Sequence, residues 1–216
     1  MHNVNNVAPT VGWDADGVLI DSRAVAFNVA EDVVRLFGHQ VQITSRDAYN
    51  AAFGTEAQKR LVGEENTATL RAMHRLLMRA RAGEVGIFTN CLAVIRQMRE
   101  RPLVITAAYG AGIKHALGDN ARFFLDIRGR ESGRKEALLE RAVAAGLKFY
   151  VTDTVRDITR CRDCGITVIA VAWGYDPLER LVHANPDFIA EDTVALTKVL
   201  NSFSLLSMNG GPDEES

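Results

Sequence analysis

The chain has few cysteines, little net charge and no long apolar run. It contains 216 residues, three of them cysteines, and its formal net charge is −2. So small and odd a set of cysteines argues against the disulfide framework of a secreted domain. The near-neutral charge argues against a nucleic-acid-binding or polybasic membrane surface, and no apolar run approaches the length that spans a bilayer. We therefore expect neither nucleic acid nor membrane as a partner.

The N-terminal residues M-H-N-V-N-N-V-A-P-T lack the basic and apolar segments of a secretory signal, so we expect a cytoplasmic protein with reduced thiols. Hydrophobic residues make up 47% of the chain and charged residues 24%, which is typical of a globular protein. The length suffices for one domain or for a domain with an inserted lobe. Residues 1–8 and 207–216 are predicted to be flexible tails.

Short β-prone runs alternate with helical segments over most of the chain. This alternation predicts an α/β fold, a Rossmann-like doubly wound parallel sheet covered on both faces, formed by residues 1–22 and 87–216. The predicted helix boundaries include an N-cap at Thr89 or Asn90, another at Ser132, and a stop at Gly165. The predicted strands end at Asp14, Thr106, Asp126, Thr152, Ala172 and Ala190.

Residues 23–86 differ from the rest, because they show helical periodicity and no convincing strand. We expect a small inserted α-helical cap domain. Its basic run from Arg71 to Arg81 is typical of a solvated helix face, with phosphate steering as the alternative. Two apolar stripes at helical spacing are predicted to be core: Phe27, Ala30, Val33, Val34 and Phe37, and then Leu70, Met73, Leu76 and Leu77.

The segment W-D-A-D-G-V-L-I-D-S, from Trp13 to Ser22, places Asp14 and Asp16 directly after the first predicted strand. Two carboxylates that converge at a strand end repel each other unless a cation lies between them. Mg²⁺ suits such a site, because it binds one or two carboxylates and completes its shell with water and phosphate oxygens. Gly17 lets backbone amides approach an anion closely. A solvated acidic turn would also explain this spacing.

Other polar residues follow at later strand ends or helix starts, where ligands bind in parallel α/β sheets. They are Thr106, Lys135, Asp153 and Asp157. Each has an ordinary structural explanation, as a strand end, a helix-surface cation or a cap. Together with the first segment they predict a phosphoryl-transfer site. In that site Asp14 attacks phosphorus, Lys135 and Thr106 hold phosphoryl oxygens, Mg²⁺ bridges Asp14 and Asp153, and Asp16 carries a proton.

These motifs resemble those of the haloacid dehalogenase superfamily of phosphohydrolases, in particular its phosphoglycolate-phosphatase-like branch with a small helical cap. The first motif matches Asp14 to Ser22, the second Thr106, the third Lys135, and the fourth Thr152, Asp153 and Asp157. The segment I-A-V-A-W-G-Y, which ends at Tyr175, is also similar to that branch.

The resemblance implies that Asp14 is the nucleophile and Asp16 the acid/base. It also implies that Mg²⁺ is held by the Asp14 side chain, the Asp16 backbone carbonyl and Asp153. Asp157 would orient a metal-bound water or the metal ligands. The presence of Asp16 favours cleavage of a phosphate ester over cleavage of a carbon–chlorine bond.

The sequence departs from the family pattern at three positions. Thr152 stands in place of a glycine, Glu136 in place of a proline, and Ala107 in place of an asparagine or serine. The first change puts a β-branched side chain beside the expected metal site. The third-motif role could instead fall to another cation, namely Arg128, Arg130 or Arg134.

The predicted function is that of a Mg²⁺-dependent phosphatase acting on a small-molecule phosphate ester. A phosphomutase would use the same aspartyl-phosphate, and a non-catalytic binding or regulatory protein would keep the fold with a weakened site. Substrate contacts are expected near Gly54, Lys59 and Arg60, although a surface loop explains that segment as well. The sequence leaves the oligomeric state and the substrate open.

Overall fold

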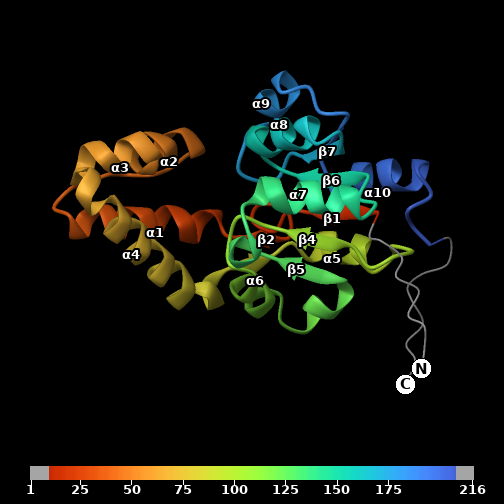
Figure 1. Cartoon of the computed structure of the whole chain (residues 1–216), viewed down its shortest axis with the longest axis horizontal. Helices are drawn as coiled ribbons and strands as arrows, with labels where there is room; N and C mark the ends of the chain where they lie inside the picture. The colour runs from red at the N-terminus through yellow and green to blue at the C-terminus, as the bar shows by residue number, and fades with distance from the viewer. Residues whose placement is uncertain (1–9, 208–216) are drawn as a thin grey trace. The chain divides into compact units, whose positions relative to one another are not determined.

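A computed structural model describes residues 10–207 of the chain (Figure 1). It divides into two compact units, one formed by residues up to Ile20 together with those from Ile87 onward, and the other by Asp21–Gly86. The division falls in two short paired strands, β2 (Ile20–Asp21) and β3 (Gly86–Ile87). The predicted tails lie outside the described residues, except for Ser207, whose N–H donates to the carbonyl of Gln97.

The first unit is built on a six-stranded parallel sheet of order β5-β4-β1-β6-β7-β8. This confirms the predicted fold class. Its strands are β1 (Val11–Trp13), β4 (Leu103–Ile105), β5 (Asp126–Arg128), β6 (Phe149–Thr152), β7 (Thr167–Val171) and β8 (Phe188–Ala190). Its helices are α5 (Thr89–Ile95), α6 (Gly110–Leu117), α7 (Lys135–Ala144), α8 (Val155–Asp163), α9 (Leu178–His183) and α10 (Thr193–Ser202), with 3₁₀ turns at Gly118–Phe123 and Arg130–Ser132.

The strand register brings three predicted site residues to one edge of the sheet. Trp13 of β1 pairs with Val104 of β4 and with Val151 of β6. Asp14, Thr106 and Asp153 each follow one of these pairing positions within two residues. Because β4, β1 and β6 are neighbours, their carboxyl ends lie side by side, as expected for a ligand site in a parallel sheet.

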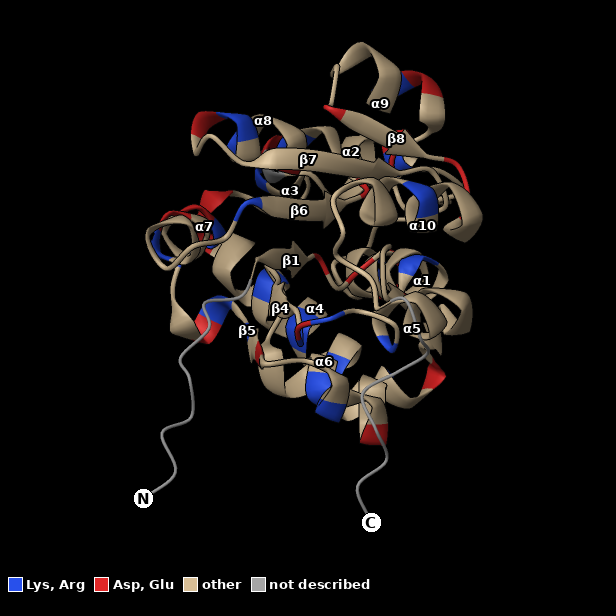
Figure 2. Cartoon of the chain, turned by 90° about the vertical axis from the view of Figure 1, so that its right-hand side faces the viewer, with Lys and Arg blue, Asp and Glu red and all other residues tan. Residues whose placement is uncertain are grey.

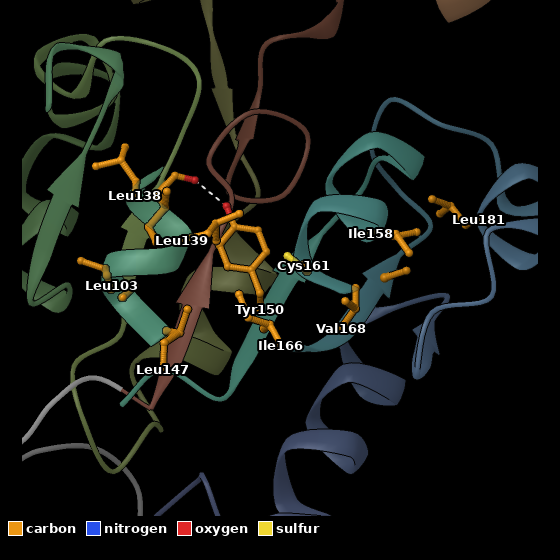
Figure 3. Close-up of a cluster of buried hydrophobic side chains, with 13 residues drawn as sticks. Leu103, Leu138, Leu139, Leu147, Tyr150, Ile158, Cys161, Ile166, Val168 and Leu181 are labelled. Carbon is orange, nitrogen blue, oxygen red and sulfur yellow. Dashed lines mark hydrogen bonds between the residues drawn. The ribbon is translucent and has the colours of Figure 1, made fainter. Parts of the chain in front are cut away.

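The sheet is covered on both faces. Figure 2 shows α7 and α8 on one side of the strands and α5 and α10 on the other. A buried cluster under α7 and α8 joins Leu103 of β4, Tyr150 of β6 and Leu139 of α7, and the Tyr150 hydroxyl donates to the carbonyl of Ile105 (Figure 3). Trp13 and Tyr150 are among the largest fully buried side chains. This apolar packing gives the strand ends a rigid base.

Several predicted boundaries in this unit are wrong. The third core strand does not end at Asp126 but begins there, because its pairing with β4 starts at Asp126, shortly after a 3₁₀ turn that ends at Phe123. Ser132 does not cap α7, since Gly133 adopts φ +136° and the helix begins only at Lys135. Thr89 is the first residue of α5 rather than its cap. Thr154 does cap α8, by accepting a hydrogen bond from the N–H of Asp157.

The Asp21–Gly86 unit is helical. Its helices are α1 (Arg23–Leu36), α2 (Arg46–Phe53), α3 (Thr55–Val62) and α4 (Thr67–Ala80), with 3₁₀ turns at Glu64–Asn66 and Ala82–Glu84. Four rings from α1, α2 and α4 make successive contacts: Phe27 with Tyr49, Tyr49 with Phe53, and Phe53 with His74. The predicted core position Leu76 is wrong, because its side chain points to solvent with 68% exposed.

Among the described residues, no helix is both long and apolar enough to cross a membrane.

Candidate active site

The turn after β1 carries Asp14 and Asp16. The Asp14 N–H donates to Val151 of β6, and its Oδ1 accepts from the N–H of Ala15 at 2.8 Å. The Ala15 carbonyl in turn accepts the N–H groups of the three residues that end at Ile20, so the turn is tightly closed. Asp14 is buried, whereas Asp16 lies two residues later in the turn and is half-buried.

Lys135 lies between two buried carboxylates. Its ammonium Nζ is 2.7 Å from Oδ2 of Asp14 and 2.6 Å from Oδ2 of Asp157. All three side chains are less than one tenth exposed. Lys135 is the first residue of α7, while Asp157 lies in the first turn of α8. The packing of two helices against the sheet therefore brings the predicted third and fourth motifs to the first.

Burial and charge act against each other in this group. Burial raises the pKa of the Asp14 carboxyl, and the neighbouring Lys135 counteracts that rise. Burial also disfavours the charged forms of Lys135 and Asp157, but the attraction between the ammonium and the carboxylate outweighs this cost of burial. The pKa of Lys135 is therefore raised above its usual value and that of Asp157 is lowered. The result is a charged, pre-formed pair beside Asp14.

Asp153 is enclosed where two loops meet after β6 and β7. Its Oδ2 accepts the N–H of Tyr175 at 2.7 Å. A Cβ added to Gly17 would lie 2.0 Å from that oxygen, and one added to Gly174 would lie 2.2 Å from it. Larger residues at these glycines would displace the carboxylate. Its other oxygen, Oδ1, is buried and has no hydrogen-bond partner among the described residues.

This environment fits a divalent cation. Burial raises the pKa of Asp153 to about 7, although the bond from Tyr175 acts to lower it. A bound cation would satisfy the unpartnered Oδ1 and relieve the cost of burying two acids, Asp153 and Asp14. In the described part of the chain, no three His, Cys, Asp or Glu residues are grouped to hold a metal. Mg²⁺ does not need three, because it retains water and binds substrate oxygens.

Thr106 is buried directly after β4. Its Oγ1 accepts the N–H of Ala108 at 3.0 Å, which orients the hydroxyl at the strand end while its own proton can donate to another group. The alternative cations lie elsewhere. Arg128 pairs with Asp126, Arg130 lies over the ring of Tyr109, and the Arg134 side chain is 88% exposed. Among these four cations, Lys135 is the one in contact with Asp14.

Sequence reasoning missed Arg160 and the role of Glu136. Nη1 of Arg160 lies 2.7 Å from Oδ1 of Asp157, and its Nη2 lies 2.7 Å from Oε1 of Glu136. The spacing of three residues between Asp157 and Arg160 on α8 is a sequence signal for such a pair. The contact with Glu136 crosses to α7 and has no such signal. Thr152, the departure from glycine, directs its hydroxyl to Asp157 with Oγ1 3.4 Å from Oδ2.

The residues expected to contact substrate lie within the helical unit. Gly54 joins α2 to α3, and Lys59 forms ion pairs with Glu56 and Glu64. Arg60 lines a hollow of about 440 Å³ together with apolar residues of α2, α3 and the segment before α2. These contacts are internal to that unit, and they leave the substrate role of this segment a prediction.

The chain is similar to known proteins in sequence and in fold. No family model matches the chain. The phosphoglycolate phosphatase of Synechococcus elongatus is 25% identical over 201 residues, which cover 83% of this chain and 91% of that protein. A haloacid dehalogenase-like hydrolase of Streptococcus pneumoniae has the same fold, with a TM-score of 0.76, 18% identity and coverage of 91% and 99% of the two chains. A predicted phosphatase of Clostridium acetobutylicum has a TM-score of 0.75 and 17% identity, and the similarity covers 91% of this chain and 99% of that one.

Proposed function

We propose that this chain, which belongs to the haloacid dehalogenase-like superfamily and to its phosphoglycolate-phosphatase-like branch, is a Mg²⁺-dependent phosphatase of a small phosphate monoester. The observation that carries this proposal is the contact of buried Lys135 with buried Asp14, together with a buried oxygen of Asp153 that has no hydrogen-bond partner within residues 10–207. A carboxylate held by a cation near a second, unsatisfied carboxylate suits a phosphoryl group with its metal ion.

In the first step, a carboxylate oxygen of Asp14 attacks phosphorus, and the bond between phosphorus and the ester oxygen breaks. The leaving alkoxide takes a proton from the carboxyl group of Asp16, and an aspartyl-phosphate remains on Asp14. Lys135 and the Thr106 hydroxyl hold phosphoryl oxygens as charge spreads over them.

In the second step, a water molecule attacks phosphorus of the aspartyl-phosphate. The carboxylate of Asp16 takes a proton from this water, the bond between phosphorus and Asp14 breaks, and inorganic phosphate leaves. Both carboxyl groups return to their starting states. The protein therefore splits a difficult displacement into two easier ones.

When bound, Mg²⁺ would be held by Asp14, Asp153 and the backbone carbonyl of Asp16, and it would neutralise charge on the phosphoryl group. The protein's own residues prepare this site. Gly17 and Gly174 leave room for the Asp153 carboxylate, and the N–H of Tyr175 fixes one of its oxygens.

The substrate class is a small phosphorylated metabolite. The relative from Synechococcus elongatus is named a phosphoglycolate phosphatase, and the similarity covers most of both chains. A short phosphorylated acid is therefore the first substrate to test.

The proposal is tested by measuring phosphate release from phosphoglycolate, sugar phosphates and nucleotides, with Mg²⁺ and with EDTA. We expect Mg²⁺-dependent release from at least one small monoester. Rapid acid quench with a ³²P-labelled substrate should trap label on the protein, and Asp14→Asn should abolish that label. A folded protein that releases no phosphate from the whole panel would contradict the proposal.

A further inference from the structure

We propose that Arg160 and Glu136 form a clamp that holds Asp157 against Lys135, so that Asp157 is a counterion for Lys135 and not a metal ligand. Arg160 and Glu136 are then positioning residues. The inference rests on the proposed phosphatase function for its catalytic consequence, because that function assigns Lys135 to the phosphoryl oxygens. The contacts themselves do not depend on it.

Both carboxylate oxygens of Asp157 are already engaged. Oδ2 lies 2.6 Å from Nζ of Lys135 and 3.4 Å from Oγ1 of Thr152, and Oδ1 lies 2.7 Å from Nη1 of Arg160. Asp157 is 3% exposed and sits between two cations. A metal ion that bound this carboxylate directly would be repelled by two cations, Lys135 and Arg160, whereas Asp14 contacts only the first of them.

Asp153 presents the opposite case. Its Oδ1 is buried without a partner among the described residues, and its Oδ2 accepts from a backbone N–H. Of the two acids of the fourth motif, Asp153 thus retains an oxygen for a cation, whereas Asp157 does not. The two carboxylates, four residues apart in the sequence, have separate tasks.

The clamp joins two helices, α8 and α7. Arg160 reaches from α8 to Glu136 of α7, with Nη2 2.7 Å from Oε1, and Glu136 directly follows Lys135. The charges alternate in sign along the row of ion pairs from Lys135 through Asp157 and Arg160 to Glu136. The Arg160 side chain is 13% exposed and both of its terminal nitrogens are paired, so it is not arranged to bind a substrate anion.

The clamp explains one departure of the sequence from its family. Glu136 stands where a proline commonly follows the lysine. A proline has no carboxylate to hold an arginine. With glutamate there, Nη2 of Arg160 is held by Glu136, while Nη1 of the same guanidinium holds Asp157 in one orientation. Lysine has a long, flexible side chain, so a fixed counterion limits where its ammonium lies relative to Asp14.

The first test measures kcat and KM for p-nitrophenyl phosphate, together with the Mg²⁺ concentration that gives half-maximal activity. In Arg160→Ala we expect kcat to fall on the order of tenfold or more, because Lys135 loses its alignment, with less than about a twofold change in the Mg²⁺ requirement. Arg160→Lys should restore part of kcat, and Glu136→Gln should show a smaller loss than Arg160→Ala. Arg156→Ala, an exposed arginine on the same helix, is the matched control.

A different pattern would overturn the clamp. If Arg160→Ala needs a much higher Mg²⁺ concentration and regains full kcat at that concentration, then Asp157 contributes to Mg²⁺ binding. A double-mutant cycle adds a second criterion, since Arg160→Ala should cause no further loss of kcat in a Lys135→Met background. Additive losses would mean that Arg160 does not act through Lys135.

The same four proteins of the cycle, unfolded in urea, test the clamp without any activity. We expect the shifts of the urea midpoint for Lys135→Met and Arg160→Ala to be non-additive, because both residues stabilise the same carboxylate. Additive shifts would contradict the clamp. If the wild-type protein releases no phosphate, the proposed function fails, and the urea cycle still decides whether Arg160 and Lys135 are coupled.

Discussion

The two units of the molecule place their charges differently. In the α/β unit, the Lys135 ammonium and the carboxylates it contacts are almost fully buried. In the helical unit, ion pairs such as Arg35 with Asp32 are formed by side chains that are 63% and 44% exposed. Removing charges from water is costly, so buried pairs persist where they fix a geometry, whereas exposed pairs contribute little. The proposed site lies in the α/β unit, where the charges are buried.

The buried polar groups of the two units also differ. In the α/β unit, Asp157 and Lys135 favour their charged forms because they pair with each other, which lowers the pKa of the acid and raises that of the lysine. In the helical unit, His74 contacts the ring of Phe53, and burial, followed by the nearby Arg75 charge, lowers its pKa to about 4. This histidine is therefore neutral at pH 7 and extends an aromatic row. The α/β unit thus buries an ion pair, and the helical unit buries a neutral imidazole against an aromatic ring.

The largest effect is expected from Asp14→Asn. The amide keeps the size of the side chain but removes the nucleophile, so turnover should fall by at least about 10⁴-fold. Circular dichroism and the urea midpoint should stay close to those of the wild type. The matched control is Asp163→Asn, at an exposed position of α8, which should leave turnover unchanged. Substantial turnover by the Asp14 variant would exclude the covalent mechanism.

Lys135→Met should affect both activity and stability. The substitution leaves two buried carboxylates without their shared cation, so the free energy of unfolding at pH 7 should fall by about 3–5 kcal/mol. We expect kcat to fall about 10²- to 10³-fold. Urea unfolding and steady-state kinetics measure the two effects. Lys148→Met, at an exposed position, is the control, and a Lys135 variant as stable as that control would contradict the contrast between units.

Asp153→Asn should change the metal requirement. Because the unpartnered Oδ1 belongs to this residue, loss of its charge should raise the Mg²⁺ concentration for half-maximal activity by at least about tenfold. Isothermal titration of Mg²⁺ into the protein without substrate gives a second reading. An unchanged Mg²⁺ affinity in this variant would place the metal elsewhere.

His74 should make the helical unit sensitive to acid. Its pKa is about 4 in the folded protein against about 6.5 for an ordinary histidine, so the unfolded chain takes up the proton first as pH falls. The contribution to stability is complete above pH 6.5 and is lost between pH 6.5 and 4, by up to about 3 kcal/mol.

His74→Phe should preserve the ring contact with Phe53 and flatten this pH dependence. Urea unfolding of both proteins at pH 4.5 and 7 measures the difference. The control is His115→Phe, at an exposed position of α6, which should leave the pH dependence as in the wild type. If His74→Phe and the wild type lose stability equally at pH 4.5, then His74 is not the acid-sensitive group.

The smallest effect is expected from Arg35→Ala in the helical unit. The pair with Asp32 is exposed, so the free energy of unfolding should change by less than about 0.5 kcal/mol, with no change in kcat. The same urea and activity measurements apply. A loss comparable to that of Lys135→Met would remove the distinction between the two units.

Much of the fold was predictable because it depends on local patterns. Alternating β-prone and helical segments predicted the parallel sheet, and all predicted strand ends except Asp126 fall within one residue of the observed ends. The errors came from residues whose conformation is set by distant partners or by the backbone. The pairing of β5 with β4 sets the start of that strand, and the positive φ of Gly133 delays α7 past Ser132. Leu76 fits a helical stripe but points away from the packed face.

The sequence by itself determined which chemical groups stand at the strand ends: Asp14 and Asp16 after the first strand, Thr106 after the second, and Asp153 after another. It could do so because those residues are adjacent in the chain to apolar runs that form strands. Only the tertiary structure decided that Lys135 joins Asp14 to Asp157, and that Arg160 joins Asp157 to Glu136. Those contacts depend on how α7 and α8 pack on the sheet, and helix packing brings together residues that no local spacing relates.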